Sequence, residues 1–91
     1  MKTIFITKLI KSQEILDSDV KIINGKTPID DRLTIYNGFN VGKYNKISIT
    51  ESIAIAGGVR YNKNNEEIKV VFLDQIDDEK KHYILSRMNI N

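Results

Sequence analysis

The chain has 91 residues, no cysteine and a formal net charge of +2, from fourteen lysines and arginines against twelve aspartates and glutamates. The missing cysteines exclude a disulfide framework, a thiolate metal site and a thiol nucleophile. The balanced charge lacks the concentrated basic face that is typical of nucleic-acid binding, and no segment approaches the roughly 18 apolar residues that span a bilayer. A chain of this size predicts one domain, residues 1–91, with one core.

Short apolar runs that are rich in β-branched isoleucine and separated by turn signals predict a mostly β chain. In chain order, the expected strands cover residues 3–9, 20–23, 32–36, 44–47 and 66–73. Polar residues 13–19 predict a turn or one short helical turn, and Asn24-Gly25 is a strong turn signal. Residues 82–90 fit either a last strand or a short helix.

The segment SIAIAGGVRY, residues 52–61, contains the only Gly-Gly pair. A phosphate-binding loop needs a glycine spacing that this segment lacks. A hairpin with a three-residue loop at 56–58 keeps a period of two. A helix at about residues 49–56 accounts for more of these residues, because Ser48 and Glu51 have the spacing of a capping box and Gly57 suits a helix end. We therefore expect the helix, with the hairpin as the alternative.

One family pattern runs through residues 33–74. Its elements are a strand at Leu33–Tyr36, the return Gly42-Lys43-Tyr44, a helix closing on Ala56-Gly57-Gly58 and a strand at Ile68–Phe72. In this order they resemble the soluble-ligand-binding β-grasp (SLBB) domain of bacterial polysaccharide export proteins, which has a close relative in the DNA-uptake competence protein. The resemblance implies an α+β fold: a β-grasp-like mixed sheet packed on one short helix (about residues 49–56), here with an N-terminal β addition. It also implies a binding and assembly module without catalytic residues or cofactors.

The polar stretch after the Gly-Gly pair is the expected binding surface. Arg60, Tyr61, Asn62 and Lys63 combine basic, aromatic and amide side chains that suit carboxylate, sugar or peptide contacts, and Tyr44 can join them. A plain surface turn gives the same letters.

Two further groups were weighed for chemistry. His82, the only histidine, stands close to Lys81 and Arg87, a set that would suit a metal-independent ribonuclease. No second acid–base group accompanies it, so no catalytic residue is expected. Residues 74–79 are acidic but lack the residue order of a calcium loop, so no metal site is expected.

These observations predict a non-enzymatic binding or assembly module whose partner is a protein or a glycan, such as an envelope export complex. Two other functions stay open: a small cytoplasmic interaction module, for instance a phage or mobile-element inhibitor of a host factor, and a small ribonuclease centred on His82. All three are compatible with a homo-oligomer. Lys8 interrupts the apolar run at the N-terminus, so no signal peptide is expected. The chain as written would then be cytoplasmic, whereas an excised domain of an export protein would lie in the cell envelope.

Overall fold

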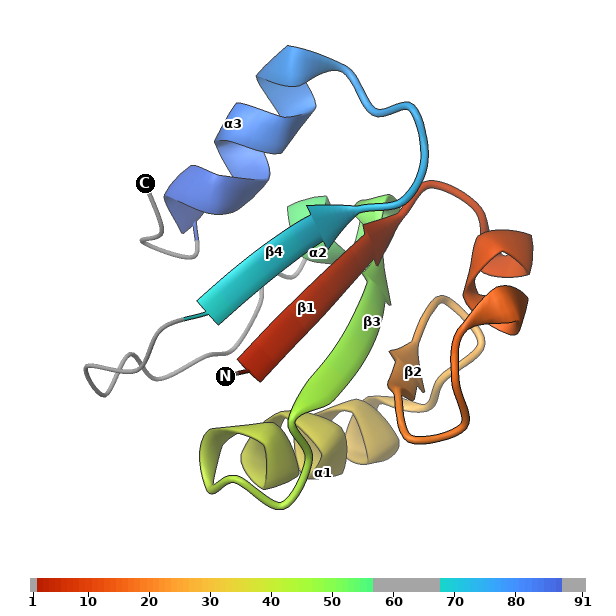
Figure 1. Cartoon of the computed structure of the whole chain (residues 1–91), viewed down its shortest axis with the longest axis vertical. Helices are drawn as coiled ribbons and strands as arrows, with labels where there is room; N and C mark the ends of the chain where they lie inside the picture. Colours follow the sequence, from red (N-terminus) through yellow and green to blue (C-terminus); the bar gives the residue numbers. More distant parts are fainter. Residues whose placement is uncertain (1, 57–67, 88–91) are drawn as a thin grey trace.

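The computed structural model describes residues 2–56 and 68–87, which form an α+β domain around one four-stranded sheet (Figure 1). The elements follow in the order β1 (Lys2–Thr7), the 3-10 helix η1 (Ile10–Ile15), β2 (Lys21–Ile23), α1 (Ile29–Asn40), β3 (Lys46–Thr50), α2 (Glu51–Ala56), β4 (Ile68–Phe72) and α3 (Asp78–Arg87). Within these ranges no helix is long and apolar enough to cross a membrane. The α+β class expected from the sequence is confirmed.

All four strands of the sheet are parallel, in the order β2-β3-β1-β4. From β1 the chain passes over β3 to reach β2, whereas from β3 it passes over β1 to reach β4. The two central strands therefore send their connections in opposite directions. This makes the space outside their carboxyl ends a topological switch point.

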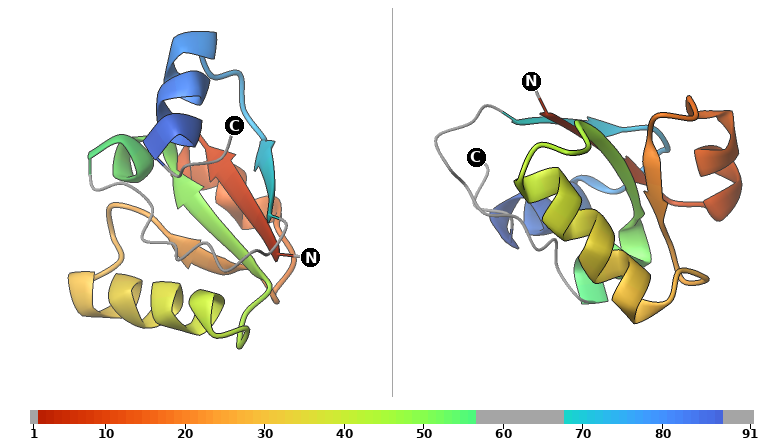
Figure 2. Two further views of the ribbon diagram at one scale, coloured as in Figure 1. Left: turned by 90° about the vertical axis from the view of Figure 1, so that its left-hand side faces the viewer. Right: turned by 90° about the horizontal axis from the view of Figure 1, so that it is seen from below.

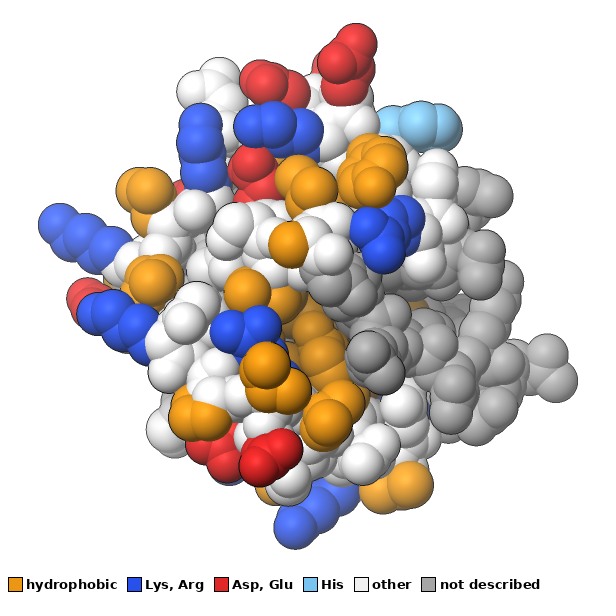
Figure 3. All heavy atoms as spheres, turned by 180° about the vertical axis from the view of Figure 1, so that it is seen from behind, with side chains coloured by type: hydrophobic (Ala, Val, Ile, Leu, Met, Phe, Trp, Pro, Cys, Tyr) orange, Lys and Arg blue, Asp and Glu red, His pale blue; other side chains and the backbone are white. Residues whose placement is uncertain are grey.

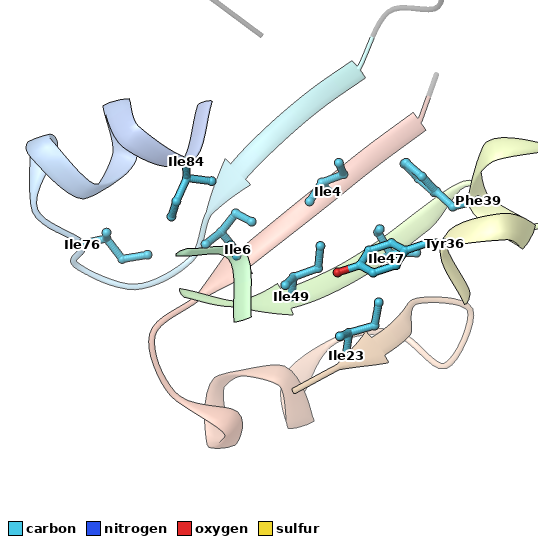
Figure 4. Packing of buried hydrophobic residues seen from close by; sticks show 10 residues of the cluster. Ile4, Ile6, Ile23, Tyr36, Phe39, Ile47, Ile49, Ile76 and Ile84 are labelled. Atoms are coloured by element: carbon cyan, nitrogen blue, oxygen red, sulfur yellow. The ribbon is translucent and has the colours of Figure 1, made fainter. Parts of the chain in front are cut away.

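An isoleucine-rich core lies between the sheet and helices α1, α2 and α3, which are on one side of it (Figure 2). In the central strands, alternate residues point into this core and are wholly buried: Ile4 and Ile6 of β1 lie beside Ile47 and Ile49 of β3. The other buried members are Ile23, Tyr36, Phe39, Ala54, Ile76 and Ile84 (Figure 4). β-branched side chains have few rotamers to lose and pack well on a pleated surface, so isoleucine suits this sheet.

The opposite face of the sheet is held to η1 by buried polar contacts. Gln13 of η1 is buried, and its Nε2 donates to the backbone oxygen of Ile23 and to Ser48 Oγ, both at 3.1 Å. Asn24 Nδ2 donates to Gln13 Oε1 at 3.0 Å. Both polar atoms of the Gln13 side chain are thus paired, as a buried amide requires. This network fastens η1 to β2 and β3.

The strand expected at residues 32–36 is wrong, because these residues lie inside α1. Asp30 and Asp31 stand in the first turn of α1, where the helix dipole favours carboxylates. Tyr36 and Phe39, three residues apart, reach the core from the same side of the helix. Five alternating letters are too few to distinguish a strand from the buried side of a helix. The expected mixed sheet is also wrong for the described strands, since every pairing is parallel.

The helix expected at residues 49–56 is confirmed only from residue 51 onward. Ile49 and Thr50 belong to β3, and α2 covers Glu51–Ala56. Ser48 does not cap this helix, since it lies within β3 and accepts a hydrogen bond from Gln13. The Gly-Gly pair lies outside the described residues.

The remaining elements follow the expectations with shifted bounds. The strands expected at 3–9, 20–23 and 66–73 are found as β1, β2 and β4, and the helical alternative for residues 82–90 is confirmed by α3 over residues 82–87. Residues 66–67 and 88–90 lie outside the described part of the chain. The polar turn expected at 13–19 overlaps η1, which starts three residues earlier, and the strand expected at 44–47 is the start of β3. Membership of the SLBB family stays a prediction, although its first strand, Leu33–Tyr36, is helical here.

Candidate functional site

A tyrosine held at the end of α1 is the centre of the candidate site. Gly42 has a φ of +84°, in the left-handed region, and turns the chain after the helix. The backbone N–H groups of Lys43 and Tyr44 then donate to the Gly38 carbonyl oxygen at 2.8 and 3.3 Å. The Tyr44 ring packs on Gly38, where a Cβ atom would lie 2.6 Å from ring atom Cδ2 and closer still to Cε2. Gly38 therefore leaves the space in which the ring is seated.

Lysine side chains surround this ring. Lys21 Nζ lies 5.0 Å and Lys43 Nζ 5.5 Å from the ring centroid, both within the range of cation–π contacts. Lys46 Nζ lies 3.6 Å from Asp19 Oδ2. An open hollow of about 360 Å³, which we call the Tyr44 hollow, is lined by Asp19, Lys21, Lys43, Tyr44, Asn45 and Lys46.

The Tyr44 hollow carries three ammonium groups against one carboxylate, so it has an excess of positive charge. The Lys46–Asp19 pair is exposed and contributes at most about 1 kcal/mol. A lysine ammonium is a compact, hydrated point charge that suits carboxylate and phosphate groups. The amide of Asn45 adds both a donor and an acceptor. The arrangement can hold an anionic group with more than one charge.

The lysines gather here because the parallel strands all start at the same edge of the sheet. Lys2, Lys21 and Lys46 are the first residues of β1, β2 and β3. Lys2 Nζ donates to the Asn40 backbone oxygen at 3.1 Å and lies 5.3 Å from the centroid of the Phe39 ring. This site was not predicted from the sequence, although Lys2, Lys21 and Lys46 each stand at the start of an expected or observed strand. That signal predicts one basic edge only once the strands are known to be parallel.

The carboxyl edge of the sheet, where parallel α/β folds commonly bind ligands, is tied together by Asp74. Its Oδ2 accepts hydrogen bonds from the backbone N–H of Lys8 at 2.6 Å and of Leu9 at 3.2 Å, and its Oδ1 accepts from Ser12 Oγ at 2.8 Å. The bond from Ser12 is the main cause that lowers the pKa of the Asp74 carboxyl below its ordinary value. Asp74 therefore fastens the start of η1 to the residues after β4.

A second acidic side chain, Glu51, follows β3 at the same edge. Its Oε1 lies 3.0 Å from Lys80 Nζ of α3, and this hydrogen-bonded pairing raises the pKa of Lys80. Among the described residues, the other oxygen, Oε2, is buried without a hydrogen-bond partner, as is the hydroxyl of Thr7 at the end of β1. The carboxyl edge thus has two unused polar atoms, whereas the amino edge has an open hollow with three cations. We take the Tyr44 hollow as the candidate site.

The structure brings only one of the expected binding residues into this hollow, namely Tyr44. The expected residues that lie outside the described part of the chain are Arg60, Tyr61, Asn62 and Lys63. His82 is exposed on α3. Within residues 2–56 and 68–87, no three metal-ligating side chains come together.

Comparisons of the chain with protein-family models, with curated proteins and with solved structures give no significant match.

Proposed function

We propose that this protein is a non-enzymatic binding module that takes an acidic segment of a protein partner into the Tyr44 hollow. The observation that carries the proposal is the Tyr44 ring, seated on Gly38, with the ammonium groups of Lys21 and Lys43 over it. The ring limits where the two flexible side chains can go, so part of the entropy cost of ordering them is met before a partner arrives. Carboxylates entering the hollow would then meet charges that are already close together.

The same geometry favours a protein segment over a glycan. Sugar rings stack on an aromatic face that is free to receive them. Here the ring packs against Gly38, and its π-system is already engaged by two ammonium groups. The groups that remain for a partner are the lysine ammonium hydrogens and the polar atoms of Asn45, which suit carboxylates and peptide amides.

The proposal does not depend on a β-grasp relationship. A close relation to SLBB domains would be supported by the helix that closes at Ala56 and by β4, but the first expected strand is helical. The hollow, by contrast, is formed by contacts of residues 19–46, whatever the family.

Titration of the isotope-labelled protein with hexaglutamate, followed by NMR, tests the proposal. We expect weak binding, with a dissociation constant on the order of 1 mM at low salt, and shifts concentrated at residues 43–46. Screening should weaken the binding steeply as the Debye length falls below about 10 Å. The double variant Lys21→Ala/Lys43→Ala should bind about tenfold more weakly, because two surface ion pairs are lost.

The matched control is Lys11→Ala/Lys26→Ala, which removes the same charge from two exposed lysines that do not line the hollow. It should bind the peptide with less than about a threefold loss, the part that general attraction contributes. Equal losses in the two double variants would show that net charge, and not the hollow, binds the peptide. Binding of neutral maltohexaose at the hollow in place of hexaglutamate would overturn the choice of a protein partner.

A further inference from the structure

An exposed acidic segment lies at the end of the molecule opposite the Tyr44 hollow. Asp77 precedes α3, Asp78 and Glu79 form its first turn, and all three are exposed. The hollow lies at the amino ends of the strands, whereas this segment follows the carboxyl end of β4. Because the strands are parallel, these are opposite edges of the sheet, with the start of α3 at the top of Figure 1 and the turn between α1 and β3 at the bottom.

The two lysines that follow these acids are engaged with the body of the domain. Lys80 Nζ pairs with Glu51 Oε1 at 3.0 Å, and Lys81 Nζ lies 5.5 Å from the centroid of the Phe72 ring. Figure 3 shows acidic side chains in red at the top of the molecule, close to basic ones in blue, at the end where α3 begins in Figure 1. The acidic segment, residues 77–79, therefore offers up to three carboxylates on one helical turn to a partner.

We infer that the acidic protein segment taken by the Tyr44 hollow is residues 77–79 of a second copy of this chain. This inference rests on the proposed function, and it names the partner. The charges are complementary: three carboxylates of one copy face Lys21, Lys43 and Lys46 of the next, of which Lys46 also pairs with Asp19 of its own copy. The two surfaces lie at opposite edges of the sheet, so a copy that uses its hollow still has its acidic segment free. The contact is heterologous, and it adds copies head to tail.

Complementary variants test this arrangement. The first variant, Asp77→Asn/Asp78→Asn/Glu79→Gln, keeps the hollow and loses the acidic segment. The second, Lys21→Ala/Lys43→Ala, keeps the acidic segment and loses the hollow. By sedimentation velocity at low salt, wild type should grow past the dimer as concentration rises, with a dissociation constant on the order of 0.1–1 mM.

Each variant alone should sediment as a monomer, and an equimolar mixture should form a heterodimer that grows no further. Raising the salt to about 0.5 M should return every sample to monomer, since exposed charges are then screened. Circular dichroism confirms that the variants are folded, and the salt dependence of wild type tests the inference even where a variant is not.

The hexaglutamate titration, run in the same buffer, separates the two claims. Peptide binding at the hollow by a wild type that stays monomeric would overturn the second copy as partner and leave the proposed function standing. Absence of both peptide binding and self-association would overturn both. Dimerisation by either variant alone would show a contact between like surfaces and would also overturn the head-to-tail arrangement.

Discussion

Replacing Gly38 by alanine should stabilise α1 but disturb the packing of the Tyr44 ring on this helix. In a helix interior, alanine is about 1 kcal/mol more favourable than glycine. Here the new methyl group would lie 2.6 Å from Cδ2 of the Tyr44 ring, so the ring must leave its seat. The overpacked contact costs about 1–3 kcal/mol, and the two cation–π contacts are worth about 0.5–1 kcal/mol each. After the helix gain is subtracted, we expect Gly38→Ala to lower the free energy of unfolding by about 1–4 kcal/mol.

Repeating Gly38→Ala in a Tyr44→Ala background tests whether the clash with the Tyr44 ring causes the loss of stability. In a Tyr44→Ala background the clash is absent, so Gly38→Ala should raise the free energy of unfolding by up to about 1 kcal/mol. Urea denaturation measures both differences, and an unchanged m value shows that only stability has changed. The sign reversal gives a coupling energy between the two sites of about 2 kcal/mol or more. Gly38→Ala should also weaken hexaglutamate binding, because Lys21 and Lys43 lose the ring that confines them.

Gly25→Ala is the matched control. Apart from its chain neighbours, no atom of the described residues lies within 4 Å of the Cβ position at Gly25, and its φ is not left-handed. Its effect on stability should stay within about 0.5 kcal/mol. An equal effect of Gly38→Ala in both backgrounds would contradict the close packing of Tyr44 on Gly38. Wild-type affinity of Gly38→Ala for hexaglutamate would contradict a role of the ring in confining Lys21 and Lys43.

Two further predictions concern how η1 is held. Asp74→Ala removes the acceptor of three hydrogen bonds and should lower the free energy of unfolding by about 1–3 kcal/mol. This loss is smaller than three buried hydrogen bonds would give, because the carboxylate is partly exposed to water. Because folding lowers the pKa of Asp74 from 3.8, its contribution is full above that pH and is lost as pH falls through the folded pKa. The difference between wild type and Asp74→Ala in urea denaturation should thus shrink below about pH 3.8, and a constant difference down to about pH 2 would contradict this. Gln13→Ala leaves the buried amide of Asn24 without its acceptor and should lower the free energy of unfolding by about 2–4 kcal/mol. The control Glu14→Ala, at the next and exposed position, should lower it by less than about 0.5 kcal/mol. Equal urea midpoints for the two variants would contradict the buried network.

The positions of the strands could be predicted from the sequence, but their direction could not. Alternating isoleucines mark β1 and β3 equally well in a parallel or an antiparallel sheet. Parallel neighbours need a long crossover, usually a helix, between them. Residues 32–36 were expected to be a strand, so the expected fold lacked the crossover helix α1 that joins β2 to β3. The mixed sheet was expected from the resemblance to the β-grasp domain, and without a helix between β2 and β3 no local pattern indicated parallel strands.

Of the residues that line the hollow, only Tyr44 was predicted from the sequence. The others were not predicted, because local sequence patterns do not show which distant residues come together. Tyr44 was expected as an aromatic side chain that could join residues 60–63, which lie outside the described part of the chain. Lys21 approaches the ring from β2, 23 positions earlier in the chain. No local pattern joins the two. Their contact exists because β2 and β3 are neighbours with a common direction.

Strand direction also gives the molecule its separation of charge. Lysines begin β1, β2 and β3, whereas Glu51 directly follows β3 and the acidic segment follows β4. In an antiparallel sheet, successive strands would place these lysines at alternating edges, and the acidic residues would be interleaved with them. In a parallel sheet the amino ends share one edge and the carboxyl ends share the other. A chain with a net charge of only +2 can therefore present a basic hollow at one end and carboxylates at the other. Complementary ends of this kind favour contacts between unlike surfaces, because two like ends repel each other.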